Sequence, residues 1–206
     1  MAEVQSGGLA AAEKYYSDYG SRARELKSSG RKVIGYMSAL CPVEILTAAG
    51  VVLVDQLSKH LVVTRLREGQ SWDLAPWLAP IFHITHVTNT GAAFGLFRGW
   101  GGFFVVIAIV VIAVILIYSH QLPAGPRLTR VALGLQLGGA IGNNLVDRLR
   151  QGFVVDFIDL NVWPLRGWPV FNVADSSIVA GVTVLALLMV REEWLAHKKK
   201  QAAPDG

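Results

Sequence analysis

Hydrophobic residues along this chain are concentrated in four long segments. The most apolar segment, 101–120, reads GGFFVVIAIVVIAVILIYSH and contains no Asp, Glu, Lys or Arg. A helix needs about 20 such residues to cross the hydrocarbon core of a bilayer. Segment 175–190 is shorter but continues backwards through apolar residues, whereas 43–66 and about 129–149 contain charged side chains. This pattern predicts an all-α integral membrane protein with four transmembrane helices.

Polar residues inside the two less apolar segments indicate a protein interior. Asp55 and Lys59 are four residues apart, so their side chains meet on one face of a helix. Ionisable residues within a membrane normally face the bundle interior and pair there. Two interpretations follow: a structural ion pair that holds the first helix in the bundle, or direct participation in a functional site. Gly134, Gly138 and Gly142 recur every four residues, a spacing that predicts close approach of a neighbouring helix.

The distribution of charge predicts the orientation of the helices. Only 17% of the residues are charged and the net charge is +4. Lys and Arg cluster at the two termini and in the loop between the second and third segments, which argues against a nucleic-acid partner. Those regions contain twelve Lys and Arg, against six on the opposite side. The positive-inside rule therefore predicts cytoplasmic termini and extracytoplasmic loops at 67–100 and 150–172.

Three regions are expected along the chain. Residues 1–40 have no apolar core and are too polar for a cleavable signal peptide, so they are predicted to be a cytoplasmic extension, partly helical over 10–27. Residues 41–195 are predicted to form the four-helix membrane domain, and 196–206 a basic cytoplasmic tail. The single cysteine, Cys41, excludes an internal disulfide and a cysteine-rich metal site.

Both extracytoplasmic loops contain segments that favour strands. Residues 81–89, IFHITHVTN, and 154–162, VVDFIDLNV, are rich in β-branched and aromatic residues and predict a small extracytoplasmic β-sheet. His83 and His86 are three residues apart, so in a strand they point to opposite faces and would not hold one ion. The sequence therefore predicts no metal site and no cofactor.

Two aspartates occupy the ends of predicted spans on the extracytoplasmic side. Asp156 follows the third span and Asp175 begins the fourth, so a returning loop can bring their carboxyl groups together. Two carboxyl groups in one site share a proton, and such a pair can activate a water and protonate a carbonyl oxygen. The pattern is also typical of structural roles: Asp175 suits the first turn of a helix, and Asp159 suits a solvated strand position. Spacing alone leaves both interpretations open.

Four motifs extend the interpretation: DQLSK at 55–59, NTGAAFGLF at 89–97, GGAIGNNLVDRLRQGFVVDFIDL at 138–160 and FNVADSSI at 171–178. In this order they resemble the bacterial lipoprotein signal peptidases, also called type II signal peptidases. The resemblance implies an aspartic endopeptidase of the bacterial cell membrane, with four helices and a small extracytoplasmic sheet. It implies that prolipoproteins are the substrates, cleaved before the diacylglyceryl-modified cysteine. It also implies contact with membrane lipids, no cofactor and a monomeric state.

Within the motifs, the family's catalytic aspartates match Asp156 and Asp175. Substrate-binding or supporting roles are implied for Asn89, Gly91, Asn144, Asp147, Arg148, Asn172, Asp55 and Lys59. One departure from the family pattern is visible. The family has two residues between its GN pair and its DR pair, whereas this chain, which reads GNNLVDR, has three. Counting back from Asp147, Asn144 takes the family's asparagine position, with the glycine one place further off, so the role belongs to either Asn143 or Asn144.

Two other classes of function remain to be compared with this one. A small polytopic transporter coupled to protons or cations, or an assembly factor, would use its aspartates as a charge path through the membrane centre. A membrane scaffold without catalytic activity would tolerate loss of both Asp156 and Asp175.

Overall fold

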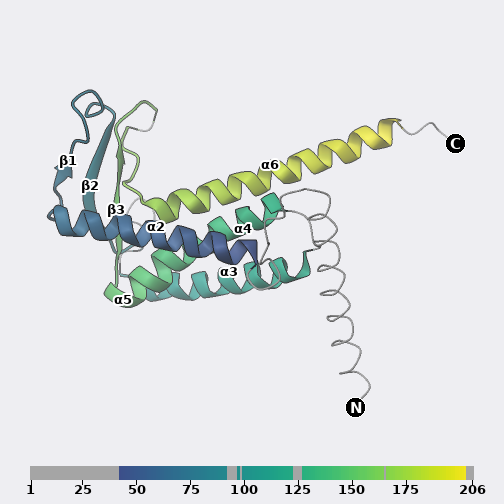
Figure 1. Ribbon diagram of the computed structural model, residues 1–206, viewed down its shortest axis with the longest axis horizontal. Coiled ribbons are helices and arrows are strands. Elements are labelled where there is room, and N and C mark those ends of the chain that lie inside the picture. Colours follow the sequence, from purple (N-terminus) through teal and green to yellow (C-terminus); the bar gives the residue numbers. More distant parts are fainter. Residues whose placement is uncertain (1–41, 92–96, 98, 123–126, 165, 203–206) are drawn as a thin grey trace, which may run out of the picture. The chain divides into compact units, whose positions relative to one another are not determined.

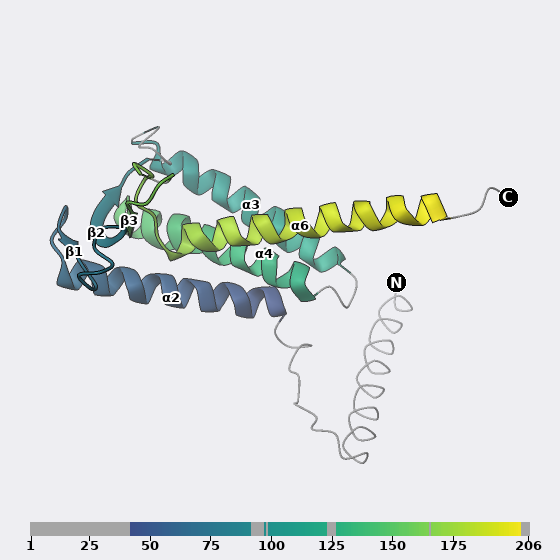
Figure 2. The ribbon, with the colours of Figure 1, turned by 90° about the horizontal axis from the view of Figure 1, so that it is seen from above.

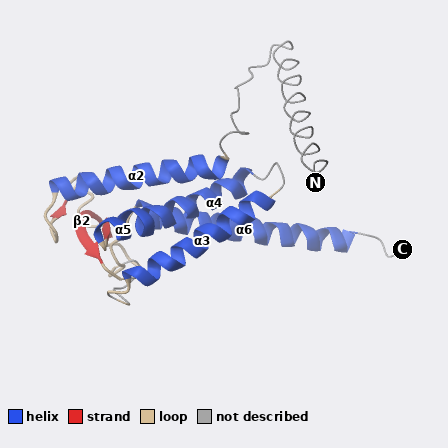
Figure 3. Cartoon of the chain, turned by 90° about the horizontal axis from the view of Figure 1, so that it is seen from below, coloured by secondary structure: helices blue, strands red, loops and turns tan. Residues whose placement is uncertain are grey.

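The computed structural model describes residues 42–202, apart from 92–96, 98, 123–126 and 165. The extension predicted over 1–40, with its partial helix, lies outside the described residues. The elements in chain order are α2 (Val43–Arg65), β1 (Ser71–Trp72), β2 (Phe82–Asn89), α3 (Gly101–Gln121), α4 (Arg127–Ala140), the π-helix η3 (Ile141–Arg148), α5 (Leu149–Gln151), β3 (Val154–Leu160) and α6 (Val173–Ala202). The protein is therefore mostly helical with a small sheet at one end of the helices (Figures 1 and 3).

Three described helices are long and apolar enough to cross a membrane, namely α2, α3 and α6. Their large apolar side chains are mostly exposed, for example Leu57, Ile109 and Val190, as a lipid-facing surface requires. The fourth expected span is present as the consecutive helical elements α4, η3 and α5, but it does not meet this criterion. By length and composition, the described residues therefore contain three candidate membrane helices, one fewer than the four predicted. α4 itself has 14 residues before η3 begins, and it lies inside the bundle, where side chains need not be apolar (Figure 2).

The central helix α4 packs closely on two neighbours at glycines, where α4 itself has no side chain. A Cβ built on Gly134 or Gly138 would lie 2.6 Å from the Cβ of Thr47 or Val51 on α2. On another face, a Cβ on Gly139 would lie 2.4 Å from the carbonyl oxygen of Ala174 on α6. These glycines let the backbones approach closely, which confirms the packing predicted from the four-residue spacing.

Gly138→Ala is therefore expected to destabilise the bundle by about 1–3 kcal/mol, because the added methyl group overlaps Val51 and the Ala48 carbonyl. Gly50→Ala is the matched control, since a Cβ on Gly50 in α2 has no neighbour within 4 Å. Thermal unfolding in detergent compares the two variants. Equal melting temperatures for Gly138→Ala and Gly50→Ala would contradict close packing of α2 on α4.

The sheet has the order β1-β2-β3 with antiparallel neighbours. The two longer strands confirm the strands predicted around 81–89 and 154–162, and an irregularity between Ile84 and Val87 shifts their register. Val87 then pairs with Asp156, and Asn89 with Val154. Beneath the sheet, Val62 and Leu66 at the end of α2 form a buried cluster with Phe157 of β3. This packing fixes the middle of β3 against the bundle.

Candidate active site

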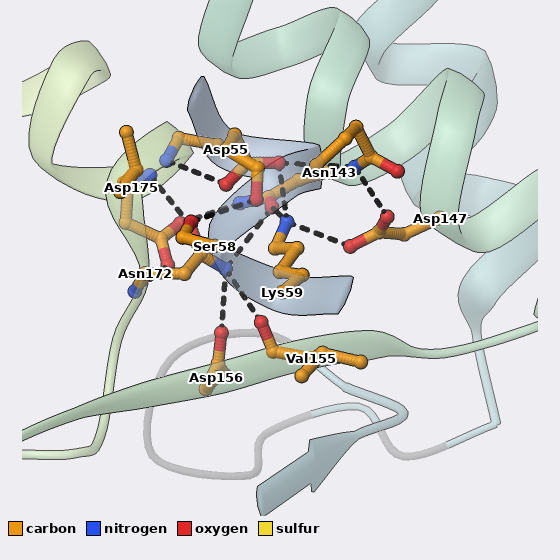
Figure 4. Close-up of polar contacts among 12 residues, drawn as sticks. Asp55, Ser58, Lys59, Asn143, Asp147, Val155, Asp156, Asn172 and Asp175 are labelled. Atoms are coloured by element: carbon orange, nitrogen blue, oxygen red, sulfur yellow. Dashed lines mark hydrogen bonds and ion pairs between the residues drawn. The ribbon is translucent and has the colours of Figure 1, made fainter. Parts of the chain in front are cut away.

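A buried polar cluster lies where α2, η3, β3 and the start of α6 meet (Figure 4). Its members are Asp55 and Lys59 of α2, Asn143 and Asp147 of η3, Asp156 of β3, and Asn172 and Asp175 at the start of α6. Burying several charges in one place is costly unless each charge is paired or hydrogen-bonded. The hydrogen bonds of the cluster therefore determine what it can do.

Asn172 links Asp156 and Asp175, which are far apart in the sequence. Its side-chain Nδ2 donates to Asp156 Oδ1 at 2.6 Å, and its backbone N donates to Asp175 Oδ2 at 3.2 Å. In return, the backbone N of Asp175 donates to Asn172 Oδ1 at 2.9 Å. One fully buried asparagine thus holds both carboxyl groups, and the negative charge of Asp175 acts on Asp156. The convergence of these two residues is as the sequence predicted.

Asp175 also stabilises the helix on which it lies. The reciprocal bonds between Asn172, which precedes α6, and Asp175 in its first turn have the pattern of a capping box. Asp175 therefore has the helix-capping role considered from the sequence, and its Oδ2 makes the capping hydrogen bond. The other oxygen, Oδ1, accepts a hydrogen bond from Asn143 Nδ2 at 2.7 Å. The capping role and a role in the carboxyl pair are compatible, because each carboxylate oxygen has more than one lone pair.

The end of β2 reaches the carboxyl group of Asp156 through Asn89. Its Nδ2 donates to Asp156 Oδ2 at 3.0 Å, and its Oδ1 accepts from the backbone N of Gly91 at 3.0 Å. Arg148 donates from Nη2 to the carbonyl oxygen of Gly91 at 2.5 Å and lies over the ring of Phe104. Arg148 therefore holds the residues that directly follow β2, while residues 92–96 of the NTGAAFGLF motif lie outside the described residues.

Lys59 is the centre of an ion-pair network behind the carboxyl pair. Its Nζ lies 2.7 Å from an oxygen of Asp55, Asp147 and Asn143. Asp55 Oδ1 in turn accepts from the backbone N of Ala174 at 3.0 Å. These contacts join α2, η3 and α6, as expected of the structural ion pair, the first of the two interpretations for Asp55 and Lys59.

Gln56 completes this network although sequence reasoning did not single it out. Its Nε2 donates to Asp147 Oδ1 at 2.8 Å and to Asp55 Oδ2 at 3.1 Å. A polar residue directly after Asp55, inside an otherwise apolar segment, was the available signal.

The π-helix η3 determines which asparagine enters the cluster. Asn143 bonds to Lys59 and Asp175, whereas the side chain of Asn144 donates to the carbonyl oxygen of Ala140 in its own helix. A π-helix has more residues per turn than an α-helix, so residues three apart diverge while residues four apart stay on one face. Asn143 and Asp147 therefore share a face. The structure places Asn143, not Asn144, beside the carboxyl groups.

The pKa of Asp156 is raised to about 7, mainly by burial and also by the negative charge of Asp175. Hydrogen bonds from Asn89 and Asn172, and the charge of Lys59, lower this pKa and offset part of the rise. A carboxyl group with such a pKa keeps its proton in mildly acidic solution, where an ordinary aspartate is ionised. The cluster can therefore hold one protonated and one ionised carboxyl group.

If catalysis needs that proton, activity is expected to fall as the pH rises through about 7, because Asp156 then loses its proton and both carboxyl groups are ionised. The pH profile of kcat/KM measures this. Asn89→Ala removes a hydrogen bond that lowers the pKa of Asp156, so the alkaline limb should move to higher pH. An alkaline limb that moves to lower pH in this variant would contradict the assignment.

Comparison with known proteins bears on the chemistry of this cluster. The family model described as signal peptidase (SPase) II matches residues 47–191. A lipoprotein signal peptidase of Bacillus subtilis (strain 168) is 42% identical over 151 residues, which are 73% of this chain and 94% of that protein. A lipoprotein signal peptidase of Halothermothrix orenii is 42% identical over 143 residues, covering 69% of this chain and 92% of that protein.

Solved structures agree with the fold. A bacterial membrane enzyme determined by the in meso method at 2.3 Å resolution superimposes with a TM-score of 0.67 and is 31% identical, covering 79% of this chain and 93% of that one. A second such enzyme, at 1.9 Å resolution, has a TM-score of 0.62 and 34% identity, covering 71% of this chain and 91% of that one. The matched region contains every residue of the polar cluster.

Proposed function

Because the chain belongs to the signal peptidase II family, whose members remove signal peptides from prolipoproteins, we propose that Asp156 and Asp175 are its catalytic pair. The chain is a multi-pass membrane peptidase that acts on prolipoproteins. The alternative of a proton- or cation-coupled transporter is not favoured by these similarities. The observation that carries the proposal is that Asn172 holds both carboxyl groups in one buried cluster.

In the proposed mechanism the pair shares one proton and binds the attacking water. The ionised carboxylate takes a proton from the water as its oxygen attacks the carbonyl carbon of the scissile amide. The protonated carboxyl group donates its proton to the carbonyl oxygen, which gives a neutral tetrahedral intermediate. Collapse of this intermediate breaks the C–N bond: one hydroxyl group returns its proton to the carboxylate that had donated it, and the departing nitrogen takes the proton that came from the water. No covalent bond to the enzyme forms, and the two aspartates titrate as one coupled pair.

Neighbouring groups would hold the substrate against the pair. Among the described residues, Nε and Nη1 of Arg148 are buried without a hydrogen-bond partner, so these atoms can donate to substrate carbonyl oxygens. Asn89 and Asn143 each donate to one of the aspartates and would keep the carboxyl groups oriented. The ion pair of Lys59 with Asp55 and Asp147 would act behind them as support.

The position of the site suits a substrate that lies partly in the membrane. Asp156 is on the sheet at the end of the bundle, and Asp175 is in the first turn of a membrane helix. We place this end on the extracytoplasmic side of the bacterial inner membrane, with both termini in the cytoplasm, because Lys and Arg are concentrated at the other end. The acyl chains of the modified cysteine would then lie in the adjacent leaflet, and cleavage would occur just before that cysteine. The enzyme is proposed to act as a monomer.

Incubation of the purified protein with a lipidated prolipoprotein tests the function. A mobility shift on a gel is expected, and mass spectrometry of the product should show the lipidated cysteine as the new N-terminus. The unlipidated precursor serves as the control substrate. Cleavage at another bond, or no cleavage of the lipidated substrate, would contradict the proposal.

A further inference from the structure

A second feature lies at the active-site end of the bundle and takes no part in the carboxylate cluster. It is an open cavity of about 560 Å³, and its lining includes Arg65, Leu66, Arg67, Glu68, Gln70 and His86. These residues come from the C-terminal end of α2, the turn after it, and β2, which lie side by side in Figure 1. The volume lies within the range of about 300–1,000 Å³ that is usual for small-molecule sites.

The polar groups of this cavity favour an anion. Arg65 and Arg67 contribute two positive charges, against the one negative charge of Glu68, whose carboxylate also accepts a hydrogen bond from Thr88. Guanidinium groups bind phosphate through two parallel hydrogen bonds. The side chain of Gln70 accepts from the backbone N of Arg67 at 3.1 Å, which fixes the turn that carries this arginine.

His86 adds a buried polar group to the lining. Its Nδ1 lies 3.0 Å from the carbonyl oxygen of Leu66, so Nδ1 carries the proton and donates it. Nε2 is then the ring nitrogen left for another partner. The histidine is only 7% exposed and is therefore held in place.

An apolar surface continues from the cavity along the outside of α2. Leu53, Leu57 and Leu61 are exposed and follow one another at intervals of four residues, so they form one row on the helix. The next residue of the same row is Arg65, which lines the cavity. A basic group at the end of a lipid-facing apolar row matches the two parts of a phospholipid, with acyl chains beside the leucines and a headgroup at the arginine.

From these observations we propose that the cavity binds the phosphate-bearing headgroup of an anionic phospholipid. Arg65 and Arg67 bind the phosphate, and the acyl chains lie along the row from Leu61 to Leu53. This ligand differs from the substrate, because the diacylglyceryl group of a prolipoprotein carries no phosphate. Occupancy stabilises the end of α2, where Leu66 packs against Phe157 beside Asp156.

The test uses the full-length protein in an uncharged detergent, with thermal unfolding followed during titration with phosphatidylglycerol. A saturable rise in melting temperature is expected. Arg65→Gln/Arg67→Gln should weaken the apparent affinity for phosphatidylglycerol at least about tenfold, since two charge-assisted contacts are lost. Its cleavage of a lipidated peptide in detergent should stay unchanged. Arg150→Gln/Arg166→Gln is the matched control, because it removes two exposed arginines outside the cavity lining and should bind the lipid normally.

Three outcomes would overturn the proposal: equal affinity in the wild type and Arg65→Gln/Arg67→Gln, an equal effect of phosphatidylcholine, or the same shift with inorganic phosphate alone. The last outcome would indicate a free anion rather than a lipid. A measurement without variants uses a photoactivatable phosphatidylglycerol on the wild-type protein. Crosslinks within 63–70 or at His86 are expected, and crosslinks confined to other segments would contradict the site.

Discussion

Replacing either Asp156 or Asp175 by asparagine is expected to lower the rate of signal-peptide removal by about 10²–10⁴-fold, the usual contribution of a proton-transfer group. Asparagine has the shape of aspartate but cannot take a proton from water or share one with a second carboxyl group. The loss should appear in kcat, because the substrate still meets the surrounding donors. Single-turnover cleavage of a lipidated prolipoprotein measures it.

Asp159→Asn is the control for this experiment. Asp159 lies on the same strand, three residues after Asp156, and its Oδ2 accepts from Thr85 Oγ1 at 2.9 Å on the other face of the sheet. The control should cleave at nearly the wild-type rate, and all three variants should melt cooperatively. Near-normal turnover in Asp156→Asn or Asp175→Asn would remove the proposed catalytic pair.

Replacing Lys59 by methionine is expected to cost about 3–5 kcal/mol of folding free energy, the usual result of breaking a buried ion pair on one side. The carboxylates of Asp55 and Asp147 are 0% and 3% exposed, so both charges would stay buried without their cation. Lys59→Met/Asp147→Asn should recover part of the loss, because one of these charges is removed. Thermal unfolding in detergent measures both effects.

Lys198→Met provides the comparison for the loss of a surface charge. Lys198 lies over the ring of Trp194 on α6, where removal of a cation should cost no more than about 1 kcal/mol. If Lys59→Met melts like the wild type but has lost activity, the buried pair acts in catalysis rather than in stability. This result would favour the second interpretation of Asp55 and Lys59.

The helices and strands could be predicted because their signals are local. An uncharged run such as 101–120 can be assigned as a membrane helix without knowing which helices it packs against. The β-branched residues around Val87 likewise favour a strand whichever strand pairs with it. The third segment was harder, because α4 is buried by its neighbours and does not need an apolar surface. Its glycine spacing predicted the close packing but not that the packing occurs on two sides.

The site could be predicted only in part because its contacts depend on register and helix type. The sequence indicated that Asp156 and Asp175 converge, but the pairing of Val87 with Asp156 depends on an irregularity in β2 that has no clear sequence signal. The choice of Asn143 depends on η3 being a π-helix, and the extra residue in GNNLVDR was its visible sign. The role of Gln56 needed the position of Asp147, which lies 91 residues away in the chain.

The shared proton can be observed by infrared difference titration of the carboxyl groups, with aspartate labelled by ¹³C. In the wild type, one protonated aspartate band should persist in mildly acidic solution and vanish as the pH rises through about 7. In Asp175→Asn that transition should move to lower pH, because the negative charge that raises the pKa of Asp156 has gone. The band should change in Asp156→Asn as well. A wild type with no protonated aspartate below neutral pH, or a band unaffected by both substitutions, would contradict a carboxyl pair that holds one proton.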